Sequence, residues 1–495
     1  MNLKVKFLDW SAGAPVVMLN KKTAELLGVH SNDRILIKTL GKNPREIFSV
    51  LGTVESLVKK KEIAVSSETG KIMELKQRQN VNVSLSSTPQ SLEFIKKKLN
   101  GKRLSELEIK KIIKDVVNNS LSGSEIALFV SAMYNKGMNL QETIDLIKSM
   151  RDVGCKIRFN GKFVVDKHCI GGIAGNRTTP IVVSICASAG LIFPKTSSRA
   201  ITSAAGTADV VETLSRVEFS VKELKKILRK TKACFIAGGF LGIVPSDSKI
   251  IQVEKLLNID PKSQLVASIM SKKIAMGAKY LLIDIPLGDY AKVKNRREAL
   301  SLKKKFELIG KHFGKKIRCV ITDGKQPIGN GIGPALEMID ILSILNRARK
   351  RPEDLEKKAV FLAGEIFDLI GKTKKGKGKY LAREILCSGK AFKKFKEIIR
   401  AQGGSVKNLK PGKYKKEILS NHSGKIKLIN SKKISILARL AGCPLDKFAG
   451  LYLHHHIGDK LIKKEKVLTI YAESKSRLKQ AIRFWEDNKD MIEIR

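Results

Sequence analysis

The sequence predicts a multidomain α/β protein with a small β-rich N-terminal domain, a helical lobe, a central α/β lobe and a C-terminal α+β domain. Its 495 residues are too many for one ordinary hydrophobic core, and 43% apolar residues are enough for a folded chain. The spacing of the apolar residues changes along the chain, from strand-like to helical and then to an alternation of both. These changes set the expected boundaries of the four parts: residues 1–85, residues 86–150 with 250–276, residues 151–249 with 277–411, and residues 412–495.

The first part, residues 1–85, contains short runs rich in Val and Ile that are separated by Gly, Asn and Ser. Such runs are typical of short strands. In residues 91–151 the apolar residues recur at helical spacing, in four segments from LEFIKKKL to LQETIDLIKSM. Ser105 and Ser122–Ser124 stand where helix N-caps are expected.

From Lys156 to about Lys410, strand-like and helical segments alternate, which predicts an α/β layer. A second helical stretch interrupts this layer near residues 246–277. After Lys413 the sequence becomes strand-like again and ends in a helix. The strand-like segments of the α/β layer are FVVDKH, IFPKTS, ACFIAG, YLLIDIP and IRCVITD.

The chain is strongly basic, with 95 Lys and Arg against 47 Asp and Glu and a formal net charge of +48. Such a charge is compatible with nucleic-acid binding, and equally with a lysine-rich surface of the kind found in thermophiles. Aromatic residues are only 5%, and zinc-finger, ribonucleoprotein and basic-zipper patterns are missing from the sequence. We therefore expect no specific nucleic-acid partner, although a basic field attracts small phosphate-bearing molecules.

The composition argues against several other classes of protein. Seven scattered cysteines without a Cys-x-x-Cys pair do not suggest a disulfide framework or a structural zinc site. The sequence also lacks the stretch of about 18 uncharged apolar residues that a membrane span needs. The start, MNLKVKFLDWSAG, does not resemble a secretion signal. We expect a soluble cytoplasmic protein without a membrane partner.

The segment VVDKHCIGGIAGNRTTPIVV (164–183) carries the densest chemical information. A strand ends in Asp-Lys-His, a glycine-rich loop follows, and Thr178 and Thr179 open an apolar helix. Glycines let the backbone approach an anion, and Lys167 with helix-start amides supplies positive field, so the pattern indicates a phosphate site. The alternative is an ordinary strand-to-helix turn with capping threonines. His168 is either a catalytic neighbour or a structural residue.

A second segment, FPKTSSRAITSAAGTADVVETL (193–214), places six hydroxyl side chains near Lys195 and Arg199. Hydroxyl and amide donors suit an oxyanion that is held without being captured covalently. The alternative is a polar loop with ordinary capping residues. Two such loops in one α/β layer favour the anion site.

The segments DKHCIGG and SSRAITSAAGTADVVE resemble the nucleoside phosphorylase class, which has two lobes and includes thymidine and pyrimidine nucleoside phosphorylases. Two further segments are similar to the same class: VASIMSKKIAMGAKYLLIDIPLG (266–288) and TDGKQPIGNGIGPALE (322–337). With the leading β-rich domain and LHHHIGDKLIKKEKVLTIYAES near the end, nearly the whole chain resembles the archaeal AMP phosphorylases of this family.

The resemblance implies a pentosyltransferase of nucleotide catabolism. It implies phosphorolysis of AMP with orthophosphate, which gives the free base and ribose 1,5-bisphosphate, with CMP and UMP as further candidate substrates. It also implies a homodimer or larger homo-oligomer that needs no metal or organic cofactor.

By the same resemblance, Asp260 is the proton donor to the leaving base. Pyrimidine enzymes carry an Arg at the matching place, whereas a carboxyl group fits protonation of a purine nitrogen. We expect burial beside residues such as Ile259 to raise the pKa of Asp260. The alternative is that Asp260 caps the helix that starts near Pro261.

The resemblance also implies the remaining site residues. Cys169 stands where the family usually has Ser, and a thiol is the weaker hydrogen-bond donor. The residues implied in AMP binding are Gly172, Ser198, Arg199, Ala200, Ile201, Thr202, Ser203, Thr207, Ser268 and Lys292. The residues implied in phosphate binding are Lys167, Thr178, Ser197 and Lys272.

The run His454–His456 is a candidate metal site that we do not favour. On a strand, His454 and His456 would share a face, and two ligands are too few for zinc.

Three alternatives to the AMP phosphorylase prediction stay open. The first is a pyrimidine nucleoside or thymidine phosphorylase, against which Asp260 and the leading domain argue. The second is a phosphoribosyltransferase of the related two-lobe fold, which usually has an acidic magnesium-binding loop that we do not find. The third is a basic RNA-binding protein.

Overall fold

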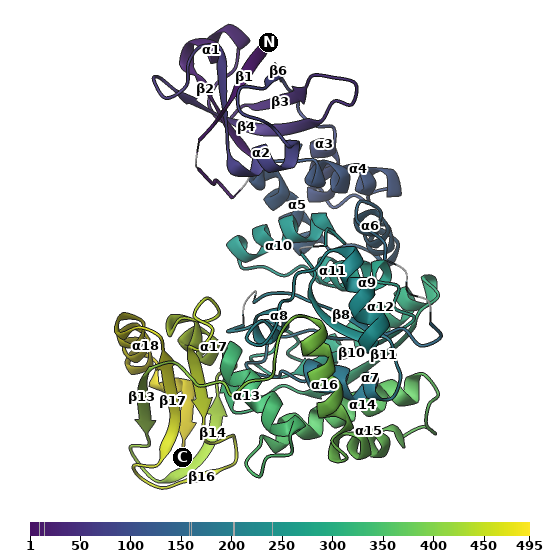
Figure 1. The fold of residues 1–495 in the computed structure, drawn as a ribbon, viewed down its shortest axis with the longest axis vertical. Helices are drawn as coiled ribbons and strands as arrows, with labels where there is room; N and C mark the ends of the chain where they lie inside the picture. The colour runs from purple at the N-terminus through teal and green to yellow at the C-terminus, as the bar shows by residue number, and fades with distance from the viewer. Residues whose placement is uncertain (9, 14, 158, 160, 201–202, 240) are drawn as a thin grey trace. The chain divides into compact units, whose positions relative to one another are not determined.

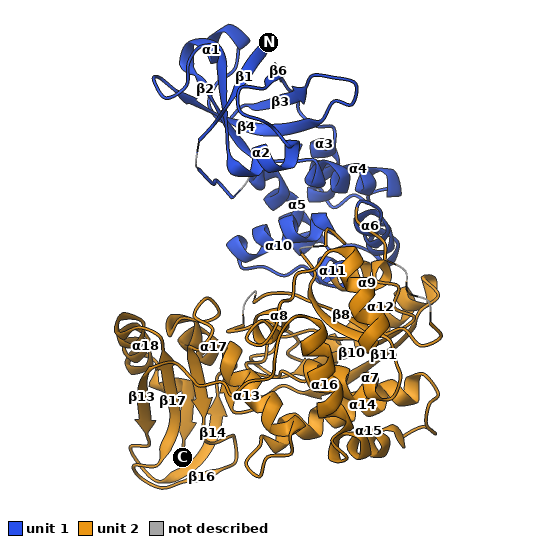
Figure 2. Ribbon diagram, in the orientation of Figure 1, with its two compact units in different colours: residues 1–153, 244–268 blue, residues 154–243, 269–495 orange. Residues whose placement is uncertain are grey.

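The computed structural model describes residues 1–495 except 9, 14, 158, 160, 201, 202 and 240 (Figure 1). Contacts within the chain divide it into two compact units (Figure 2). Unit 1 is Met1–Val153 with Val244–Ser268, and unit 2 is Gly154–Ile243 with Ile269–Arg495. Both units contain helices and strands, and the predicted multidomain α/β fold class is confirmed.

Unit 1 begins with a closed β-barrel whose strand order is β1-β5-β2-β4-β3-β6. Buried and exposed residues alternate along β1 and β3, so one face of each strand fills the barrel. The sixth strand and the two short helices of this part had no prediction from the sequence. The elements are β1 Asn2–Phe7, β2 Val16–Asn20, α1 Lys21–Leu27, β3 Arg34–Thr39, β4 Glu46–Val54, β5 Glu62–Val65, α2 Ser67–Met73 and β6 Asn80–Leu85.

Unit 1 continues as a group of helices, of which the four predicted in residues 91–151 are confirmed. Ser105 caps α4: its hydroxyl accepts from the Glu108 amide at 3.3 Å, and the Glu108 carboxylate accepts from the Ser105 amide at 2.7 Å. Ser122 caps α5 in the same way. Helix α11 crosses from unit 1 into unit 2 after Ser268. The helices are α3 Ser91–Leu99, α4 Glu106–Val117, α5 Gly123–Lys136, α6 Leu140–Asp152, α10 Pro245–Leu257 and α11 Lys262–Ala275.

Unit 2 contains the α/β layer, and its five predicted strands are confirmed. Strands pair in parallel in the orders β11-β10-β7 and β8-β9. The Val165 amide donates to the Ile192 carbonyl at 2.9 Å beside a parallel bridge between Val164 and Ile192, which joins the two groups of strands. The strands are β7 Val165–Cys169, β8 Phe193–Ser197, β9 Ala233–Ala237, β10 Tyr280–Leu287 and β11 Lys316–Asp323.

Helices surround this sheet and share one large buried apolar core with it. Helices α7 and α13 are apolar almost throughout, which fits their burial. None of the helices in the described parts of the chain is long and apolar enough to cross a membrane. The helices are α7 Thr179–Ser188, α8 Thr207–Val211, α9 Val221–Thr231, α12 Arg296–His312, α13 Pro334–Leu345, α14 Glu353–Leu369, α15 Gly378–Cys387 and α16 Lys390–Ala401.

The C-terminal part of unit 2 has two antiparallel sheets, β12-β15-β17-β13 and β16-β14-β18. Strand β12 comes from the segment 322–337 of the α/β layer, so the two parts of unit 2 share a sheet. Ala174 and Ala204, from the two predicted anion loops, belong to the apolar core of this C-terminal part. The elements are β12 Gly331–Ile332, β13 Tyr414–Leu419, β14 Gly424–Ile429, α17 Ser431–Leu440, β15 Gly450–Leu453, β16 Lys460–Leu461, β17 Lys466–Ala472, α18 Lys475–Asp487, a short 3₁₀ helix Lys489–Met491 and β18 Ile492–Ile494.

Candidate functional site

The candidate site lies at the carboxyl edge of the sheet in unit 2, where the loops after β7, β8 and β11 leave it. Ligands of α/β proteins usually bind at this edge. The loop after β7 rests on the loop after β11, because the Asn176 amide donates to the Ile328 carbonyl at 2.7 Å and the Ile328 amide donates to Ala174 at 3.2 Å. The loops therefore form one connected structure.

Lys167 on β7 is a buried ammonium, with 1% of its surface exposed. Its Nζ donates to the Thr178 hydroxyl at 2.8 Å, and within the described residues it has no second hydrogen-bond acceptor. Burial lowers the pKa of Lys167, and the charges of Lys358 and Arg177 lower it further. The lysine thus keeps donors that an anion could use.

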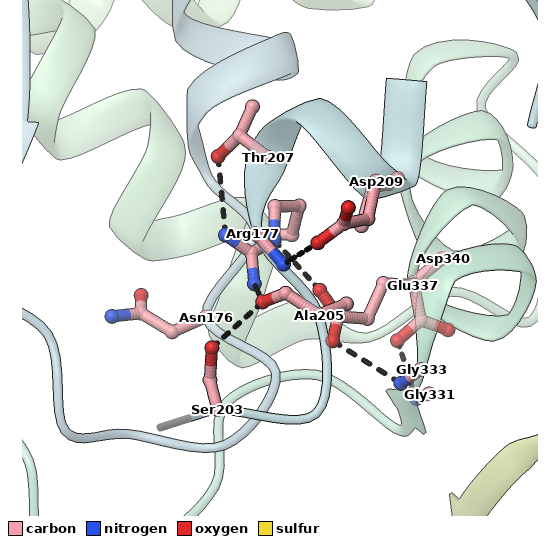
Figure 3. Close-up of polar contacts among 12 residues, drawn as sticks. Asn176, Arg177, Ser203, Ala205, Thr207, Asp209, Gly331, Gly333, Glu337 and Asp340 are labelled. Carbon is pink, nitrogen blue, oxygen red and sulfur yellow. Dashed lines mark hydrogen bonds and ion pairs between the residues drawn. The ribbon is translucent and has the colours of Figure 1, made fainter. Parts of the chain in front are cut away.

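Arg177 connects the loop after β7 to the loop after β8 (Figure 3). Its guanidinium donates to the Thr207 hydroxyl at 3.1 Å and to the Ala205 carbonyl at 2.7 Å. The Nε donates to the Glu337 carboxylate on α13 at 2.6 Å. The planar guanidinium of Arg177 therefore links the loop after β7 to the loop after β8 and to α13.

Three buried carboxylates fix the backbone of these loops. Asp209 accepts from the amides of Ala200 and Gly206 at 2.7 and 2.8 Å. Glu337 accepts from the Gly333 amide at 3.2 Å, and burial raises its pKa. Asp340 accepts two backbone amides of the segment 330–331 at 2.7 Å, and burial raises its pKa to about 7. These contacts fix the loop backbone from within the protein.

Beneath the loops lies a buried cluster of charges around Asp166. Lys195 donates to Asp166 at 3.3 Å and to the carbonyls of Lys167 and Thr196 at 2.9 and 2.8 Å. Lys273 pairs with the other Asp166 oxygen at 2.7 Å. Burial and the surrounding lysines hold the pKa of His168 well below its usual value, so this imidazole is neutral at pH 7. Burial holds the pKa of Lys195 well below its usual value, so this lysine serves mainly as a hydrogen-bond donor that fixes the strand ends beneath the loops.

Gly172 allows a close approach that a side chain would prevent. A Cβ at this position would lie 2.5 Å from the backbone nitrogen of Lys292, and the φ of Gly172 is +93°. Gly206 has an ordinary extended backbone, but a Cβ there would lie 2.4 Å from the Ser198 carbonyl oxygen. Gly172 and Gly206, one in each loop, thus serve close backbone packing.

The hydroxyl-rich loop after β8 is only partly arranged for ligand binding. The buried Ser197 hydroxyl has no hydrogen-bond partner among the described residues, whereas Ser203 donates to the Ala205 carbonyl at 2.8 Å. Ser198 is exposed, and residues Ile201 and Thr202 lie outside the described residues. Ser197 is therefore available to a ligand, and the AMP-binding roles predicted for the loop stay predictions.

Arg199 forms ion pairs within the protein. Its guanidinium pairs with both Glu212 oxygens at 2.8 and 2.9 Å and with Glu218 at 2.8 Å, and it lies 3.4 Å from Asp209. These carboxylates raise the pKa of Arg199, with hydrogen bonding to Glu212 the largest cause. These pairs use the two terminal nitrogens of the guanidinium, and the predicted contact of Arg199 with AMP stays a prediction.

Cys169 ends β7 beneath the glycine loop. Its sulfur accepts from the Asn176 amide group at 3.4 Å, and burial raises the pKa of the thiol. The residue is thus a protonated thiol in a structural contact.

The remaining predicted residues lie apart in the chain. Asp260 and Ser268 belong to unit 1, and Lys272 and Lys292 belong to unit 2. The burial that we expected at Asp260 is wrong, because the turn after α10 leaves this side chain exposed. Ser268 and Lys272 are half-buried on α11, and Lys292 is exposed after β10.

The histidine run does not lie on a strand, because β15 ends at Leu453. The His454 ring contacts the Thr469 hydroxyl at 2.9 Å, and the His456 ring contacts the Asn330 side chain at 2.9 Å. Among the described residues, no group of three His, Cys, Asp or Glu side chains could hold a metal ion. His456 instead links the C-terminal part to the loop after β11.

The pairing of several charged side chains of the site had no prediction from the sequence. Arg177 and Glu337 lie inside the segments that carry the family resemblance, but their pairing spans 160 residues. Asp166 and Lys195 also lie in those segments. In the sequence, Asp166 precedes Lys167 and Lys195 precedes Thr196, which indicates that both lie near the site. This proximity does not show which charged side chains pair with each other.

Three family models match consecutive parts of the chain. The helical bundle domain of a glycosyl transferase family matches residues 92–154, and the a/b domain of that family matches residues 161–392. The pyrimidine nucleoside phosphorylase C-terminal domain matches residues 425–490. A solved structure of anthranilate phosphoribosyltransferase from Thermus thermophilus shares the fold, with a TM-score of 0.53 and 18% identity over 63% of this chain and 99% of that one.

Several relatives match almost the whole chain. An AMP phosphorylase from Methanococcus vannielii is 40% identical over 97% of this chain and 95% of its own length. An AMP phosphorylase from Pyrococcus furiosus is 42% identical over 97% of this chain and 96% of its own length. A putative thymidine phosphorylase from Legionella pneumophila (strain Paris) is 40% identical over 92% of this chain and 87% of its own length. Identity at this level over the full length shows that the chain belongs to the AMP phosphorylase family, within the thymidine and pyrimidine nucleoside phosphorylases.

Proposed function

We propose that this protein cleaves AMP with orthophosphate, giving adenine and ribose 1,5-bisphosphate. The observation that carries the proposal is the similarity to AMP phosphorylases, 40% or more over 97% of the chain. The geometry of the loops supports it, because Lys167 and Arg177 each donate to a threonine hydroxyl at the carboxyl edge of the sheet. Such a site suits phosphate groups.

The proposed reaction transfers the ribose from adenine to phosphate. A phosphate oxygen attacks the anomeric carbon, and the bond from that carbon to the adenine nitrogen breaks with its electron pair going to adenine. The transition state carries positive charge on the ribose, which the adjacent phosphate offsets. We assign to Asp260 the proton that neutralises adenine as it leaves.

The proposed ligand contacts follow the family residues. Lys167, Thr178, Ser197 and Lys272 would hold phosphate. Gly172, the run Ser198–Ser203, Thr207, Ser268 and Lys292 would hold AMP. CMP and UMP are further candidate substrates. Seven free cysteines fit the proposed location in the cytoplasm, which is a reducing compartment, and a homodimer or larger homo-oligomer is the proposed assembly.

Thymidine phosphorolysis is the second candidate function. The Legionella relative supports it, since its identity is similar to that of the AMP phosphorylases. Asp260 argues against it, because pyrimidine enzymes place an Arg at the matching position.

Phosphate-dependent release of free base tests the proposal. AMP, adenosine, CMP, UMP and thymidine are each incubated with the full chain, with and without orthophosphate, and the base is measured by chromatography. We expect adenine from AMP only when phosphate is present. Activity on thymidine alone would support the second candidate. If no base is released and RNA binding collapses with salt, the RNA-binding alternative is favoured.

The role of Asp260 is tested with Asp260→Asn and the matched control Asp487→Asn, an exposed residue on α18. A general acid contributes about 10²- to 10⁴-fold to the rate, so kcat on AMP should fall by that order in Asp260→Asn. The control should keep full activity. Unchanged kcat in Asp260→Asn would remove this residue from the mechanism.

A further inference from the structure

Arg177 has no role in the binding assignments above, but its guanidinium contacts Thr207, which is assigned to AMP binding. Its side chain is 14% exposed and the Glu337 side chain 2%, so the ion pair at 2.6 Å is shielded from water. The guanidinium also donates to the Thr207 hydroxyl at 3.1 Å and to the Ala205 carbonyl at 2.7 Å (Figure 3). The orientation of Arg177 is therefore fixed from three sides.

The contact with Thr207 has a direction that follows from chemistry. A guanidinium has five N–H donors and no acceptor, so in this hydrogen bond the Thr207 oxygen must accept. The single hydroxyl proton of Thr207 then points elsewhere, and none of the residues that the structure describes accepts it. Thr207 is nearly buried, with 9% of its surface exposed, so a ligand that reaches this hydroxyl would be its acceptor.

The same pattern recurs at Lys167. An ammonium also has only donors, and Lys167 donates to the Thr178 hydroxyl at 2.8 Å. The hydroxyl proton of Thr178 likewise finds no acceptor within the described parts of the chain. Two cations thus turn two hydroxyls into donors, and a group that accepts several hydrogen bonds at once is an oxyanion such as phosphate.

We propose that Arg177 is a positioning residue that fixes the Thr207 hydroxyl as a hydrogen-bond donor to a phosphate oxygen of the substrate. Arg177 itself does not need to touch the substrate. The role rests on the proposed function, which makes the ligand an anion. Glu337 anchors Arg177 through their ion pair, and Asp209 holds the amides of Ala200 and Gly206, the latter next to Thr207.

A double-mutant cycle tests the proposal, because a residue that acts through Thr207 loses its effect once the hydroxyl is gone. The variants are Arg177→Met, Thr207→Val and the two together, in the full chain. Calorimetry measures the Kd of AMP and of inorganic phosphate. A hydrogen bond to a charged group corresponds to about 10- to 100-fold in affinity, so each single variant should weaken AMP or phosphate binding by about that factor.

The expected result is that the double variant binds no more weakly than Thr207→Val alone. Thr207→Ser keeps the hydroxyl and should retain the dependence on Arg177, whereas Thr207→Val should lose it. Losses that multiply in the double variant, or unchanged binding in Arg177→Met, would overturn the proposal. Thermal unfolding of each variant shows whether the fold is intact, and Arg177→Gln, whose amide oxygen can also accept from Thr207, replaces Arg177→Met in the cycle if the latter unfolds.

Because the double-mutant cycle measures binding and not catalysis, its result can be separated from the test of the proposed reaction. If the wild-type chain binds phosphate but releases no adenine from AMP, the proposed function fails and the cycle still reports on Arg177. If adenine is released and the cycle is additive, the function stands and the role of Arg177 is wrong.

Discussion

At the scale of single residues, Lys167 is the buried group on which the phosphate site most depends. Few buried lysines lack a carboxylate hydrogen-bond partner, because a charge in a low-dielectric interior is costly. Lys167 has only the Thr178 hydroxyl within the described residues. The charge of Asp284 acts on Lys167 without a hydrogen bond to it, and a bound phosphate would supply a counter-charge in direct contact with the ammonium.

Replacing Lys167 should weaken phosphate binding in a manner that depends on pH. Lys167→Met should raise the Kd of orthophosphate by roughly 10- to 100-fold near pH 7. Burial lowers the pKa of Lys167, so the lysine loses its charge at a pH below that of an ordinary lysine. The ratio of the two Kd values should therefore fall as pH rises through that pKa. Calorimetry at several pH values measures it, and the control Lys226→Met on the surface of α9 should match the wild type at every pH.

Gly172 and Gly171 offer a matched pair for testing the close approach of the loop. Both have φ near +95°, so alanine strains the backbone by about 1–3 kcal/mol at either position. Only at Gly172 would the new Cβ also meet the backbone nitrogen of Lys292, at 2.5 Å. We expect kcat/KM for AMP to fall at least about tenfold more in Gly172→Ala than in Gly171→Ala. Equal losses in the two variants would show that the contact with Lys292 is unimportant for activity.

At the scale of elements, the segment 322–337 links the α/β layer to the C-terminal part. It leaves β11, passes under the loop after β7, adds strand β12 to the C-terminal sheet and enters α13. Asp340 on α13 holds the turn before β12 by accepting the amides of Asn330 and Gly331. The side chain of Asn330 in turn contacts His456 and Tyr452. The C-terminal part is thereby attached to the candidate site.

The raised pKa of Asp340 predicts how stability changes with pH. Its pKa is about 7 in the folded protein and 3.8 in the unfolded chain, so the folded state binds the proton more tightly. The stability from this proton is complete below about pH 4 and is lost as the pH rises through 7. Chemical unfolding of the wild type and of Asp340→Asn at pH 4 to 8 measures the difference in the free energy of unfolding. The free energy of unfolding of the wild type should fall relative to that of Asp340→Asn as pH rises, by at most roughly 1.4 kcal/mol per pH unit. A difference independent of pH would contradict the expected titration.

At the scale of the whole molecule, the protein has a net charge of +48, whereas its two proposed substrates, AMP and orthophosphate, are anions. A positive field of this size raises the local concentration of anions and their rate of encounter. The field is screened over the Debye length, which falls from about 30 Å at 0.01 M salt to about 3 Å at 1 M. The charge therefore affects association more than it affects the chemistry in the loops.

We expect kcat/KM for AMP to fall about tenfold or more as KCl rises across that range, with little change in kcat. Steady-state kinetics at each salt concentration measure this. Glycine added in place of KCl is the control, since a zwitterion leaves the ionic strength unchanged and should leave kcat/KM unchanged. A flat salt dependence would mean that the surface charge does not guide the substrate.

The sequence by itself determined the fold class, the strands of the α/β layer, the four helices after the barrel and the family. These features depend on local signals, such as apolar spacing and the capping of α4 by Ser105, or on contiguous motifs like DKHCIGG. Only the tertiary structure decided which charges pair, that Asp260 is exposed and that β12 joins the C-terminal sheet. Arg177 lies 30 residues from Thr207 and 160 from Glu337, and no local pattern specifies a partner at such a separation. The pairing arises from the parallel sheet, which brings the carboxyl ends of distant strands to one edge.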